Sequence, residues 1–461
     1  MKFFSIILMV ALVLATNLFS QTYKPTWESL DSRPIPQWFQ DAKFGIFIHW
    51  GLYSVPAWGP TKDVGIYEKY AEWYWWSLTN PNRESYDQFN KIHKAFYGEK
   101  TKYQDFVSGF NCDMFEPAEW ARIFKQGGAQ YIVLTSKHHE GFCLWPSRHS
   151  WNWNAVDAGP HRDLAGDLIA AVRDAGLHMG YYYSLYEWFN PLYKNDVHAY
   201  VDQHMLPQMK DLVKRYEPDI FWTDGEWDYP SEVWKSTEFL AWLYNESPVK
   251  EHVVVNDRWG KETRGFHGGI WTTEYDLVHA DNANEMEIEH YWEECRGIGT
   301  SFGYNRNEYL ENYSTSEELV HILINKVARG GNLLLNVGPT ADGRIPVIMQ
   351  QRLKDMGDWL AVNGEAIYGT RKWKNMPKVT PETNIYFTTK GQDLYVLCTV
   401  FPTKSVTVDG VSKGSVSMLG YDGEIKSSAK GKSLTIEPPN LTPANNPCDY
   451  AWVFKIEGAL K

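Results

Sequence analysis

The sequence predicts an α/β protein in which a (β/α)8-like TIM barrel, residues 21–370, is followed by a C-terminal β-sandwich, residues 371–461. Between residue 44 and about residue 340, short apolar runs alternate with longer amphipathic stretches in seven or eight repeats. Strands that alternate with helices form a parallel sheet, and this number of repeats favours a closed barrel over an open, doubly wound sheet. No GxGxxG motif follows the first apolar run, which weakens the case for an open dinucleotide-binding sheet.

Seven apolar runs in the first part of the chain are typical of strands that are buried on both faces, because they are short and rich in β-branched and aromatic residues. These runs are 44–50, 131–139, 179–184, 220–224, 253–257, 269–274 and 333–337. Between them, amphipathic periodicity predicts helices that include 163–175, 199–216 and 316–328.

The pattern changes after about residue 370, where short strand-like runs are separated by Gly, Pro and Asp turns. The runs are 384–400, 405–411, 414–419 and 433–436. Their aromatic residues alternate in a way that favours a place in the core, and a carbohydrate-binding role for this domain stays open as the alternative. Because no low-complexity linker precedes the sandwich, we expect the two domains to pack closely.

The first 20 residues are predicted to be a secretory signal peptide. Met1-Lys2 carries one positive charge, an apolar run extends from Phe3 to about Ala15, and a small residue precedes a cut after Ser20. The run is too short to span a membrane, and no later segment reaches the ~18 uninterrupted apolar residues that a span requires. We therefore expect a secreted or periplasmic protein with no membrane partner.

The composition limits the kinds of molecule that the protein is expected to bind. The chain of 461 residues has a formal net charge of −12, so it lacks the positive field on which sequence-independent nucleic-acid binding depends. Its 22 Trp residues suit a sugar-binding site, because an indole has a flat face and a polar edge, and a large Trp-rich core would explain them equally well. The five cysteines are odd in number and lack CxxC spacing, which excludes a dense disulfide framework.

Polar side chains follow the predicted strands at one and the same end. In a TIM barrel the catalytic groups stand at the carboxyl ends of the strands. A single polar residue there is more often a cap, but caps are distributed over both ends of a barrel, so seven ends in register indicate a site. The ends are 49–51, 137–142, 181–184, 222–226, 256–259, 272–274 and 301–305.

The adjacent histidines His138 and His139 do not predict a metal site. Neighbouring residues of a strand point to opposite faces and rarely share one ion, and the HExxH spacing of a helical zinc site is missing. We expect no metal and no cofactor. Neutral imidazole and indole groups suit the recognition of single hydroxyl groups instead.

Glycoside hydrolysis needs two carboxylates, one as nucleophile or base and one as proton donor. Asp224 is the predicted nucleophile, because it ends a rigid apolar run; its competing role is a helix N-cap, which Gly225 permits. Three residues are candidates for the acid. Glu274 at a strand end ranks first, Glu293 in a stretch interpreted as loop-like ranks second, and Glu72 beside an aromatic cluster ranks third.

Eight short motifs occur in order along the chain. They are Trp38-Phe39, Lys43-Phe44-Gly45-Ile46-Phe47-Ile48-His49-Trp50-Gly51, Ser54-Val55-Pro56, Glu72-Trp73-Tyr74, Lys137-His138-His139-Glu140-Gly141-Phe142, Trp222-Thr223-Asp224-Gly225, Asn256-Asp257-Arg258-Trp259 and Asn332-Leu333-Leu334-Leu335-Asn336-Val337-Gly338-Pro339. Together they resemble glycoside hydrolase family 29, the retaining α-L-fucosidases. The resemblance spans about residues 25 to 370, and such an ordered set of motifs is highly specific.

This resemblance implies a (β/α)8-like catalytic domain with a C-terminal β-sandwich, and it makes Asp224 of the Trp-x-Asp-Gly motif the nucleophile. Glu274 matches the family's Thr-x-Glu segment and Glu293 matches a Trp-Glu segment, so the order of the acid candidates stays open. Phe302 and neighbouring indoles are implied to face the C6 methyl group of fucose. The residues implied to contact the sugar are His49, Glu72, Trp73, His138, His139, Tyr183, Trp222, Arg258 and Phe302.

The function implied by the resemblance is that of an exported, retaining exo-α-L-fucosidase with a fucosylated glycan as substrate. An α-L-galactosidase-like glycosidase and a catalytically inactive, lectin-like fucose-binding protein stay open as alternatives. A pure binding protein has no need of paired carboxylates at the anomeric carbon, which argues against the latter. The motifs specify neither the linkage (α1,2, α1,3, α1,4 or α1,6) nor the oligomeric state, and we expect the loops 59–70 and 278–289 to shape the leaving-group side.

Overall fold

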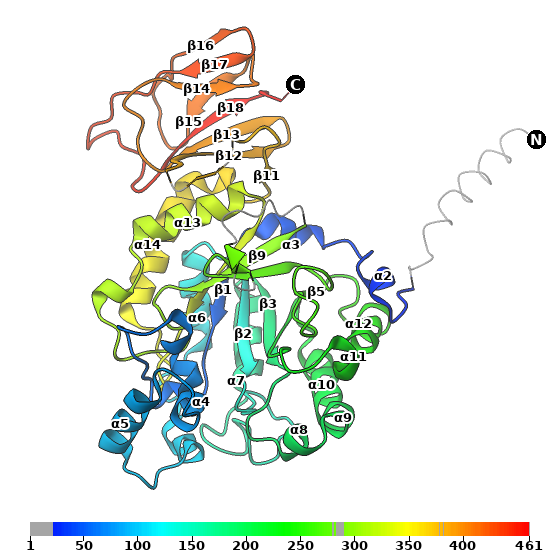
Figure 1. Cartoon of the computed structure of the whole chain (residues 1–461). Helices are drawn as coiled ribbons and strands as arrows, with labels where there is room; N and C mark the ends of the chain where they lie inside the picture. The colour runs from blue at the N-terminus through cyan, green and yellow to red at the C-terminus, as the bar shows by residue number, and fades with distance from the viewer. Residues whose placement is uncertain (1–21, 279–280, 283–289, 378, 381, 461) are drawn as a thin grey trace, which may run out of the picture.

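The first part of the chain folds into a barrel of eight parallel strands (Figure 1). The computed structural model describes residues 22–278, 281–282, 290–377, 379–380 and 382–460. Around the barrel the strands follow the order of the sequence, and a parallel bridge between Asn256 and Ile270 closes the ring, which confirms the predicted fold class. The strands are β1 (Phe44–Ile48), β2 (Tyr131–Lys137), β3 (His178–Ser184), β4 (Ile220–Asp224), β5 (Val254–Val255), β6 (Trp271–Glu274), β9 (Trp292–Gly297) and β10 (Asn332–Val337).

The barrel strands are buried on both faces, as their apolar sequences predict. Every residue of β1 and of β2 is buried, and β1 pairs with β2 on one side and with β10 on the other. Close approach at this point requires Gly45, since a Cβ atom there would lie 2.3 Å from the ring of Tyr131. The predicted runs 44–50, 131–139 and 253–257 extend beyond the observed strands, so their last polar residues belong to the loops that follow.

Helices surround the barrel (Figure 1). Their ends carry ordinary caps: the Asp163 carboxylate accepts a hydrogen bond from Gly166 N at 2.9 Å, and Thr315 and Glu318 form a reciprocal capping box. The helix predicted at 316–328 is confirmed, and the one at 163–175 agrees to within one residue at each end. The main outer helices of the described part are α6 (Pro117–Gln126), α7 (Leu164–Asp174), α10 (Leu206–Tyr216), α12 (Ser236–Asn245), α13 (Ser316–Ala328) and α14 (Val347–Asn363).

The stretch predicted as the helix 199–216 is helical throughout, but it is divided. The short helix α9 (Val197–Tyr200) leads into a π-helical turn, Val201–Met205, which continues into α10. Another short helix, α8 (Pro191–Asn195), precedes α9, and these elements lie at the end of the barrel to which the strands point (Figure 1). The helices α4 (Tyr74–Thr79) and α5 (Tyr86–Tyr97) lie at the same end.

Strand β9 corrects the interpretation of residues around 293 as a loop-like, solvated acidic stretch. Its two glutamates are buried, its arginine is partly buried, and internal partners satisfy all three. The Glu294 carboxylate accepts a hydrogen bond from the Thr273 hydroxyl and forms an ion pair with Arg296. Because such pairing allows charged residues to lie inside a barrel, the apolar pattern by which strands are recognised is missing here.

The C-terminal part forms the predicted β-sandwich (Figure 1). One antiparallel sheet has the order β11-β12-β13-β18-β15 and the other has the order β14-β17-β16, and apolar side chains such as Val396, Ile436 and Phe454 form the core between them. Strands β11, β16 and β18 were absent from the sequence prediction. The strands are β11 (Arg371–Lys372), β12 (Ile385–Lys390), β13 (Asp393–Cys398), β14 (Val406–Asp409), β15 (Ser415–Met418), β16 (Ser427–Lys430), β17 (Ser433–Ile436) and β18 (Trp452–Glu457).

The sandwich packs directly against the barrel helices α13 and α14, as expected for domains without a linker. Trp359 Nε1 donates a hydrogen bond to the carbonyl of Ala451 at 2.8 Å, and His321 Nε2 donates to the carbonyl of Tyr450 at 2.8 Å. The buried aromatic side chains of β12 and β13 alternate between the two cores, with Tyr386 and Tyr395 on the barrel side and Phe387 inside the sandwich.

All five cysteines are free thiols, and four of them are buried. Burial raises the pKa of Cys143 to about 12, so this thiol stays protonated. Within the described ranges, no helix combines the length and the apolar character needed to cross a membrane.

Candidate active site

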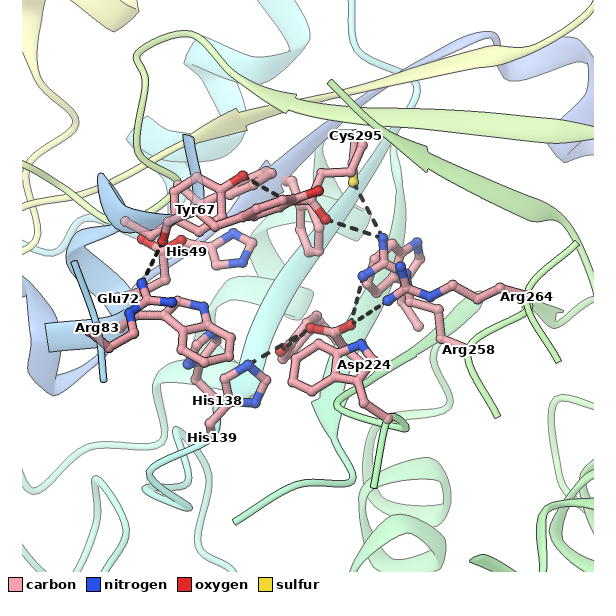
Figure 2. A pocket seen from close by; sticks show the side chains of 18 residues that line it. His49, Tyr67, Glu72, Arg83, His138, His139, Asp224, Arg258, Arg264 and Cys295 are labelled. Carbon is pink, nitrogen blue, oxygen red and sulfur yellow. Dashed lines mark hydrogen bonds and ion pairs between the residues drawn. The ribbon is translucent and has the colours of Figure 1, made fainter. Parts of the chain in front are cut away.

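A cavity of about 370 Å³ opens at the carboxyl ends of the barrel strands. Its wall combines aromatic rings with histidine, arginine and carboxylate side chains, which come from the strand ends and the loops after them (Figure 2). The lining residues are Phe47, His49, Tyr67, Tyr70, Glu72, Trp73, Arg83, His138, His139, Tyr182, Trp222, Asp224, Trp227, Arg258, Arg264, Glu274, Cys295 and Phe302.

Asp224 is the last residue of β4 and projects into this cavity from the barrel. The next residue, Gly225, has a φ of +74°, and a Cβ atom there would lie 2.6 Å from Cβ of Tyr186, so the chain turns away from the cavity directly after Asp224. The next helix, α11 (Ser231–Trp234), has Pro230 as its N-cap residue. The competing role of Asp224 as a helix cap is therefore wrong.

The two carboxylate oxygens of Asp224 have different partners. Oδ1 lies 2.6 Å from Arg258 Nη1 and 3.5 Å from Arg264 Nη2, whereas Oδ2 accepts a hydrogen bond from the Tyr182 hydroxyl at 2.9 Å. His139 Nε2 lies 4.0 Å from Oδ2, so the carboxylate sits between the imidazole and the two guanidinium groups (Figure 2).

The positive charges fix the ionisation of Asp224. Burial raises the pKa of this carboxyl group, but Arg258 and the other nearby cations outweigh burial and hold the pKa well below its usual range. Arg258 is itself rigid, because its Nε donates to Thr272 Oγ1 at 3.0 Å and its guanidinium lies over the Trp222 ring, 4.5 Å from the centroid. Asp224 is thus an oriented carboxylate throughout the neutral pH range.

Glu274 ends β6 and faces the same guanidinium group. Its Oε2 atom lies 3.5 Å from Arg258 Nη2, and its Oε1 atom accepts a hydrogen bond from the Tyr70 hydroxyl at 2.8 Å. Arg258 therefore holds Asp224 at one terminal nitrogen and Glu274 at the other. The cavity brings together the predicted nucleophile and the acid candidate that ranked first.

Glu293 does not line the cavity. On β9 it is buried inside the barrel, where Oε2 accepts a hydrogen bond from the Tyr131 hydroxyl at 2.5 Å and Oε1 accepts one from Trp222 Nε1 at 3.1 Å. Burial raises the pKa of Glu293 to about 7, because neutral donors only partly compensate the loss of water. Trp222 separates this carboxyl group from the cavity: its ring lines the wall while its N–H is already used by Glu293.

Glu72 lines the cavity on the opposite wall. Its Oε2 atom accepts hydrogen bonds from Gly303 N at 2.8 Å and from Ser301 Oγ at 3.2 Å. Burial raises the pKa of Glu72 even though these donors and the nearby His138 oppose the rise. Glu72 is therefore a fully buried carboxyl group tied to the loop that carries Phe302.

The three predicted histidines all line the cavity. The Asn336 side-chain amide donates to a backbone carbonyl, so its Oδ1 atom accepts a hydrogen bond from His49 Nδ1 at 2.6 Å. In the same way, Ser184 Oγ donates to a backbone carbonyl and accepts a hydrogen bond from His139 Nδ1 at 2.6 Å. Burial is the main cause, and the neighbouring His138 the second, that lowers the pKa of His49 to about 3 and the pKa of His139 well below 6.5. Both rings are neutral with Nε2 unprotonated, which suits acceptance of a hydrogen bond from a hydroxyl group.

The expectation that His138 and His139 point to opposite faces is wrong. Strand β2 ends at Lys137, so the strand alternation does not reach the two histidines, whose ring centroids lie 4.1 Å apart in the same wall. Among the described residues, no group of three or more His, Cys, Asp or Glu side chains is arranged to hold a metal ion.

The structure places Tyr182, not Tyr183, in the cavity. The Tyr183 side chain points out of the barrel, where its hydroxyl donates to Gln208 Oε1 at 2.8 Å. Tyr182 pairs in register with Trp222 on the neighbouring strand and stacks on its ring with a centroid distance of 5.7 Å. Because side chains alternate along β3, a choice between adjacent tyrosines is a choice between the two faces of the barrel wall.

The remaining aromatic candidates line the cavity as predicted. The Phe302 ring lies 4.8 Å from the His49 ring and 6.4 Å from the Phe47 ring, and the Trp73 ring lies 5.0 Å from the His139 ring. The aromatic rings therefore lie among the hydrogen-bonding groups of the wall, with Phe302 beside His49 and Trp73 beside His139. Such a mixed lining suits a ligand that is polar at most positions and apolar at one.

Several lining residues were missed by the sequence analysis. The loop expected to shape the leaving-group side, 59–70, contributes Tyr67 and Tyr70, whereas most of its counterpart, 278–289, lies outside the described residues. Arg264 reaches the cavity from a loop and forms an ion pair with Glu226, Nε to Oε1, at 2.6 Å. Tyr182 and Phe47 had a usable signal, because both lie on recognised strands. The other missed residues that line the cavity are Arg83, Trp227 and Cys295.

The arrangement is suited to displacement at a carbon that carries two oxygens. A fixed carboxylate, a second carboxyl group across one guanidinium and neutral hydrogen-bonding rings are the parts that glycoside hydrolysis requires. The described part of the site offers no activated serine or cysteine nucleophile, since the lining Cys295 is buried and burial raises its pKa well above the usual value.

Comparisons with known proteins agree with this geometry. A family model described as "Alpha-L-fucosidase" matches residues 10–365, and one described as "Alpha-L-fucosidase C-terminal domain" matches residues 378–457. The chain is 44% identical over 474 residues to an alpha-L-fucosidase of Dictyostelium discoideum, with 98% of each chain covered. It is 43% identical over 450 residues to the tissue alpha-L-fucosidase of Homo sapiens, covering 95% of this chain and 92% of the relative.

The fold is also similar to solved structures. The alpha-fucosidase of Thermotoga maritima in complex with a mechanism-based inhibitor superposes with a TM-score of 0.80 at 38% sequence identity, covering 94% of this chain and 99% of that chain. The similarity thus extends over the barrel and the sandwich together.

Proposed function

The chain belongs to the alpha-L-fucosidase family of glycoside hydrolases, and on that premise we propose that it is an exported, retaining exo-α-L-fucosidase. It removes terminal α-L-fucosyl residues from oligosaccharides or glycoconjugates by double displacement. The observation that carries this proposal is the position of Asp224, a carboxylate kept ionised by Arg258 at the bottom of a small cavity and opposed by Glu274 on the same guanidinium.

In the first step, Asp224 attacks C1 of the fucosyl unit while Glu274 gives its proton to the departing oxygen. The attacking oxygen is oriented before the substrate arrives, because Arg258, Arg264 and Tyr182 fix both oxygens of the carboxylate. The bond from C1 to the leaving oxygen breaks as the bond from C1 to Asp224 forms, and the product is a fucosyl ester of the enzyme.

In the second step, Glu274 takes a proton from water, which attacks C1 and releases L-fucose with retained configuration. The shared Arg258 links the two steps. When Asp224 becomes an ester it loses its negative charge, so Glu274 is left as the carboxylate that faces the guanidinium. A charged Glu274 is what a general base requires at that moment.

We propose Glu274 rather than Glu293 as the acid/base because only Glu274 lines the cavity. Glu293 is separated from the cavity by Trp222 and serves to fix that indole ring. Glu72 remains close to the sugar, where its hydrogen bonds from the Gly303 backbone N–H and the Ser301 hydroxyl suit it to hold a hydroxyl group rather than to move between protonation states.

The proposed substrate specificity follows from the side chains that line the cavity. The neutral His49 and His139 accept hydrogen bonds from ring hydroxyl groups, while Phe302 meets the C6 methyl group that distinguishes fucose from a sugar with a C6 hydroxyl. A galactose-configured sugar would bury that hydroxyl against Phe302 and Phe47 without a partner. The α-L-galactosidase-like alternative is therefore disfavoured by the same wall.

Export and domain limits are part of the proposal. Residues 1–20 act as a signal peptide that is cut after Ser20, and they lie outside the described residues. The catalytic domain is 21–370 and the sandwich is 371–461. N-terminal sequencing of the protein recovered from the medium or periplasm should give Gln21 as the first residue; an intact Met1 on exported protein would contradict the assignment.

The direct test is the anomeric configuration of the first product. Hydrolysis of 4-nitrophenyl α-L-fucoside followed by proton NMR should show α-L-fucose before mutarotation, and the corresponding α-L-galactoside should react much more slowly. Initial release of the β-anomer would mean an inverting enzyme, and faster release of L-galactose would identify the alternative specificity.

A further inference from the structure

A second cavity of about 390 Å³ opens beside the active site, and none of the proposed catalytic residues lines it. It is built from the loop after β2 and the segment after β3, so it lies on the catalytic face of the barrel. Its floor and rim are formed mainly by Trp151, Trp153, Phe189, Asn190, Glu187 and His204.

The rim carries an aromatic side chain that packing does not explain. Trp151 is 79% exposed, whereas Trp153 and Phe189 below it are partly buried and have ring centroids 6.0 Å apart. Leaving an indole in water costs hydrophobic free energy, and an exposed flat ring above a cavity is the arrangement with which proteins hold the apolar face of a sugar.

The polar groups of this cavity are fixed in place. The buried Glu187 forms ion pairs with Lys137 and, at 3.1 Å, with His204, and its other oxygen accepts from Asn190 Nδ2 at 2.9 Å. Burial opposes ionisation, but Lys137 and His204 lower the pKa of Glu187 to about 2. Such a network gives a ligand preorganised hydrogen-bonding groups, which reduces the entropy lost on binding.

The lining also limits the charge of the ligand. Two carboxylates, Glu140 and Glu187, belong to the wall, and the described residues that line it include neither Lys nor Arg. Lys137, the cation that neutralises Glu187, is buried behind the wall with its Nζ atom over the Tyr183 ring. Glu140 is then the carboxylate that an anionic sugar would meet, so the cavity favours a neutral sugar.

A continuous row of aromatic rings joins the two cavities. Trp73 lines the active site and contacts Trp188 at 5.8 Å, Trp188 contacts Trp75 at 5.3 Å, and Trp75 contacts Phe189 of the second cavity at 4.7 Å, all between ring centroids. Glu140 connects them as well, because it lines the second cavity while its Oε2 atom lies 3.6 Å from Nδ1 of the active-site His138.

We propose that this second cavity binds a neutral pyranose unit of the glycan that carries the fucose, with Trp151 stacked on the sugar ring. The inference rests on the proposed function, since it places the fucosyl unit in the first cavity and a more distant part of the leaving group in the second. Its consequence is a preference for fucosylated oligosaccharides over fucosides with a small leaving group.

The test compares Trp151→Ala and Trp151→Phe with a control, Phe96→Ala, which removes an aromatic ring of similar exposure, 68%, that lines neither cavity. Each variant is assayed on 4-nitrophenyl α-L-fucoside and on a fucosylated neutral pentasaccharide of the linkage that the wild type cleaves fastest. Trp151→Ala should raise KM for the pentasaccharide about five- to tenfold, the equivalent of one lost stacking contact. It should change KM for the aryl fucoside by less than about twofold. Trp151→Phe should bring KM for the pentasaccharide most of the way back to the wild-type value.

A binding measurement separates this inference from the proposed function. Calorimetric titration with lacto-N-tetraose, a neutral tetrasaccharide without fucose, should show binding to the wild type and to Phe96→Ala that weakens in Trp151→Ala, and a sialylated form should bind more weakly. If the wild type hydrolyses no fucoside, the proposed function fails and the titration still decides this site. Equal effects of Trp151→Ala on both substrates, or no effect on either substrate, would overturn the inference even in an active fucosidase.

Discussion

Asp224 and Glu293 are both buried carboxyl groups inside one barrel, yet their surroundings shift their pKa values in opposite directions. Asp224 faces Arg258 and Arg264, which hold its pKa well below the usual range in spite of burial. Glu293 faces only the neutral donors Tyr131 and Trp222, and burial raises its pKa to about 7. Burial alone thus makes a carboxyl group neutral, and a cation is needed to keep a nucleophile ionised.

The two groups also lie in different layers of the barrel. Trp222 separates them, with its ring facing the cavity and its N–H directed to Glu293. In the proposed mechanism the layer with the arginines carries out the chemistry, while the layer below fixes the position of the wall. Four substitutions test this division.

The largest effect is expected for Asp224→Ala. Loss of the nucleophile should lower kcat by about 10⁴-fold or more, as for other members of covalent catalytic sets. Circular dichroism should still show the folded protein, whereas thermal unfolding should occur at a lower temperature, because the buried Arg258 loses a partner. Wild-type-like turnover of an aryl fucoside by a correctly folded variant would remove Asp224 from the mechanism.

Glu274→Gln should reduce kcat/KM by about 10²- to 10⁴-fold for substrates whose leaving group needs a proton. The loss should be much smaller with fucosyl fluoride, whose leaving group departs without one. Added azide should react with the accumulated ester and give α-L-fucosyl azide. Equal losses on both substrates without azide rescue would indicate that another residue is the acid/base, and Glu72→Gln is the variant to compare.

Arg258→Met should lower kcat/KM by about 10²- to 10³-fold at neutral pH, the effect of removing one fixed charge from a buried site. Without this cation, burial raises the pKa of Asp224, so the acidic limb of the pH profile of kcat/KM should move to higher pH. Arg258→Lys keeps the charge and should shift the limb less. An unchanged limb in Arg258→Met would show that Asp224 is kept ionised by other groups.

Glu293→Gln should change kcat by less than about threefold, since the group lies outside the cavity, but it should change the pH dependence of stability. The protonated form of Glu293 is favoured in the folded state, where the pKa is about 7 instead of 4.5. In the wild type, Glu293 therefore makes its full contribution to the free energy of unfolding below about pH 4.5. That free energy falls by up to about 3 kcal/mol as the pH rises through 7. Urea unfolding at both pH values should show that loss in the wild type and not in the variant; parallel behaviour of the two proteins would contradict the assignment.

The sequence analysis found residues of the cavity where they stand on regular structure. Asp224 and Glu274 stand at the ends of strands that were recognised from their apolar runs, and most of the sugar-contacting residues implied by the motifs line the cavity. Glu293 was misplaced because β9 is half charged and gives no apolar pattern. Internal ion pairs can be recognised only when the partners from other strands are in view.

The other wrong or missing predictions concern the face of a strand that points into the barrel and the loop residues that reach the cavity. Tyr183 was taken from the family resemblance, and nothing in a single strand states which alternate set of side chains faces inward; the register of β3 with β4 decides it. Arg264 and Tyr67 come from loops, where no periodicity links sequence to direction. Physical reasoning from the sequence therefore reached the residues on strand ends and missed those whose place depends on tertiary packing.

The measurement closest to the central claim is the identification of the residue that forms the covalent intermediate. The enzyme is incubated with 2-deoxy-2-fluoro-α-L-fucosyl fluoride, digested, and its peptides are mapped by mass spectrometry. We expect a single fluorofucosyl ester on Asp224, in the peptide that contains Trp222 and Gly225. An ester on Glu274 or Glu72, or full inactivation without any label on Asp224, would contradict it.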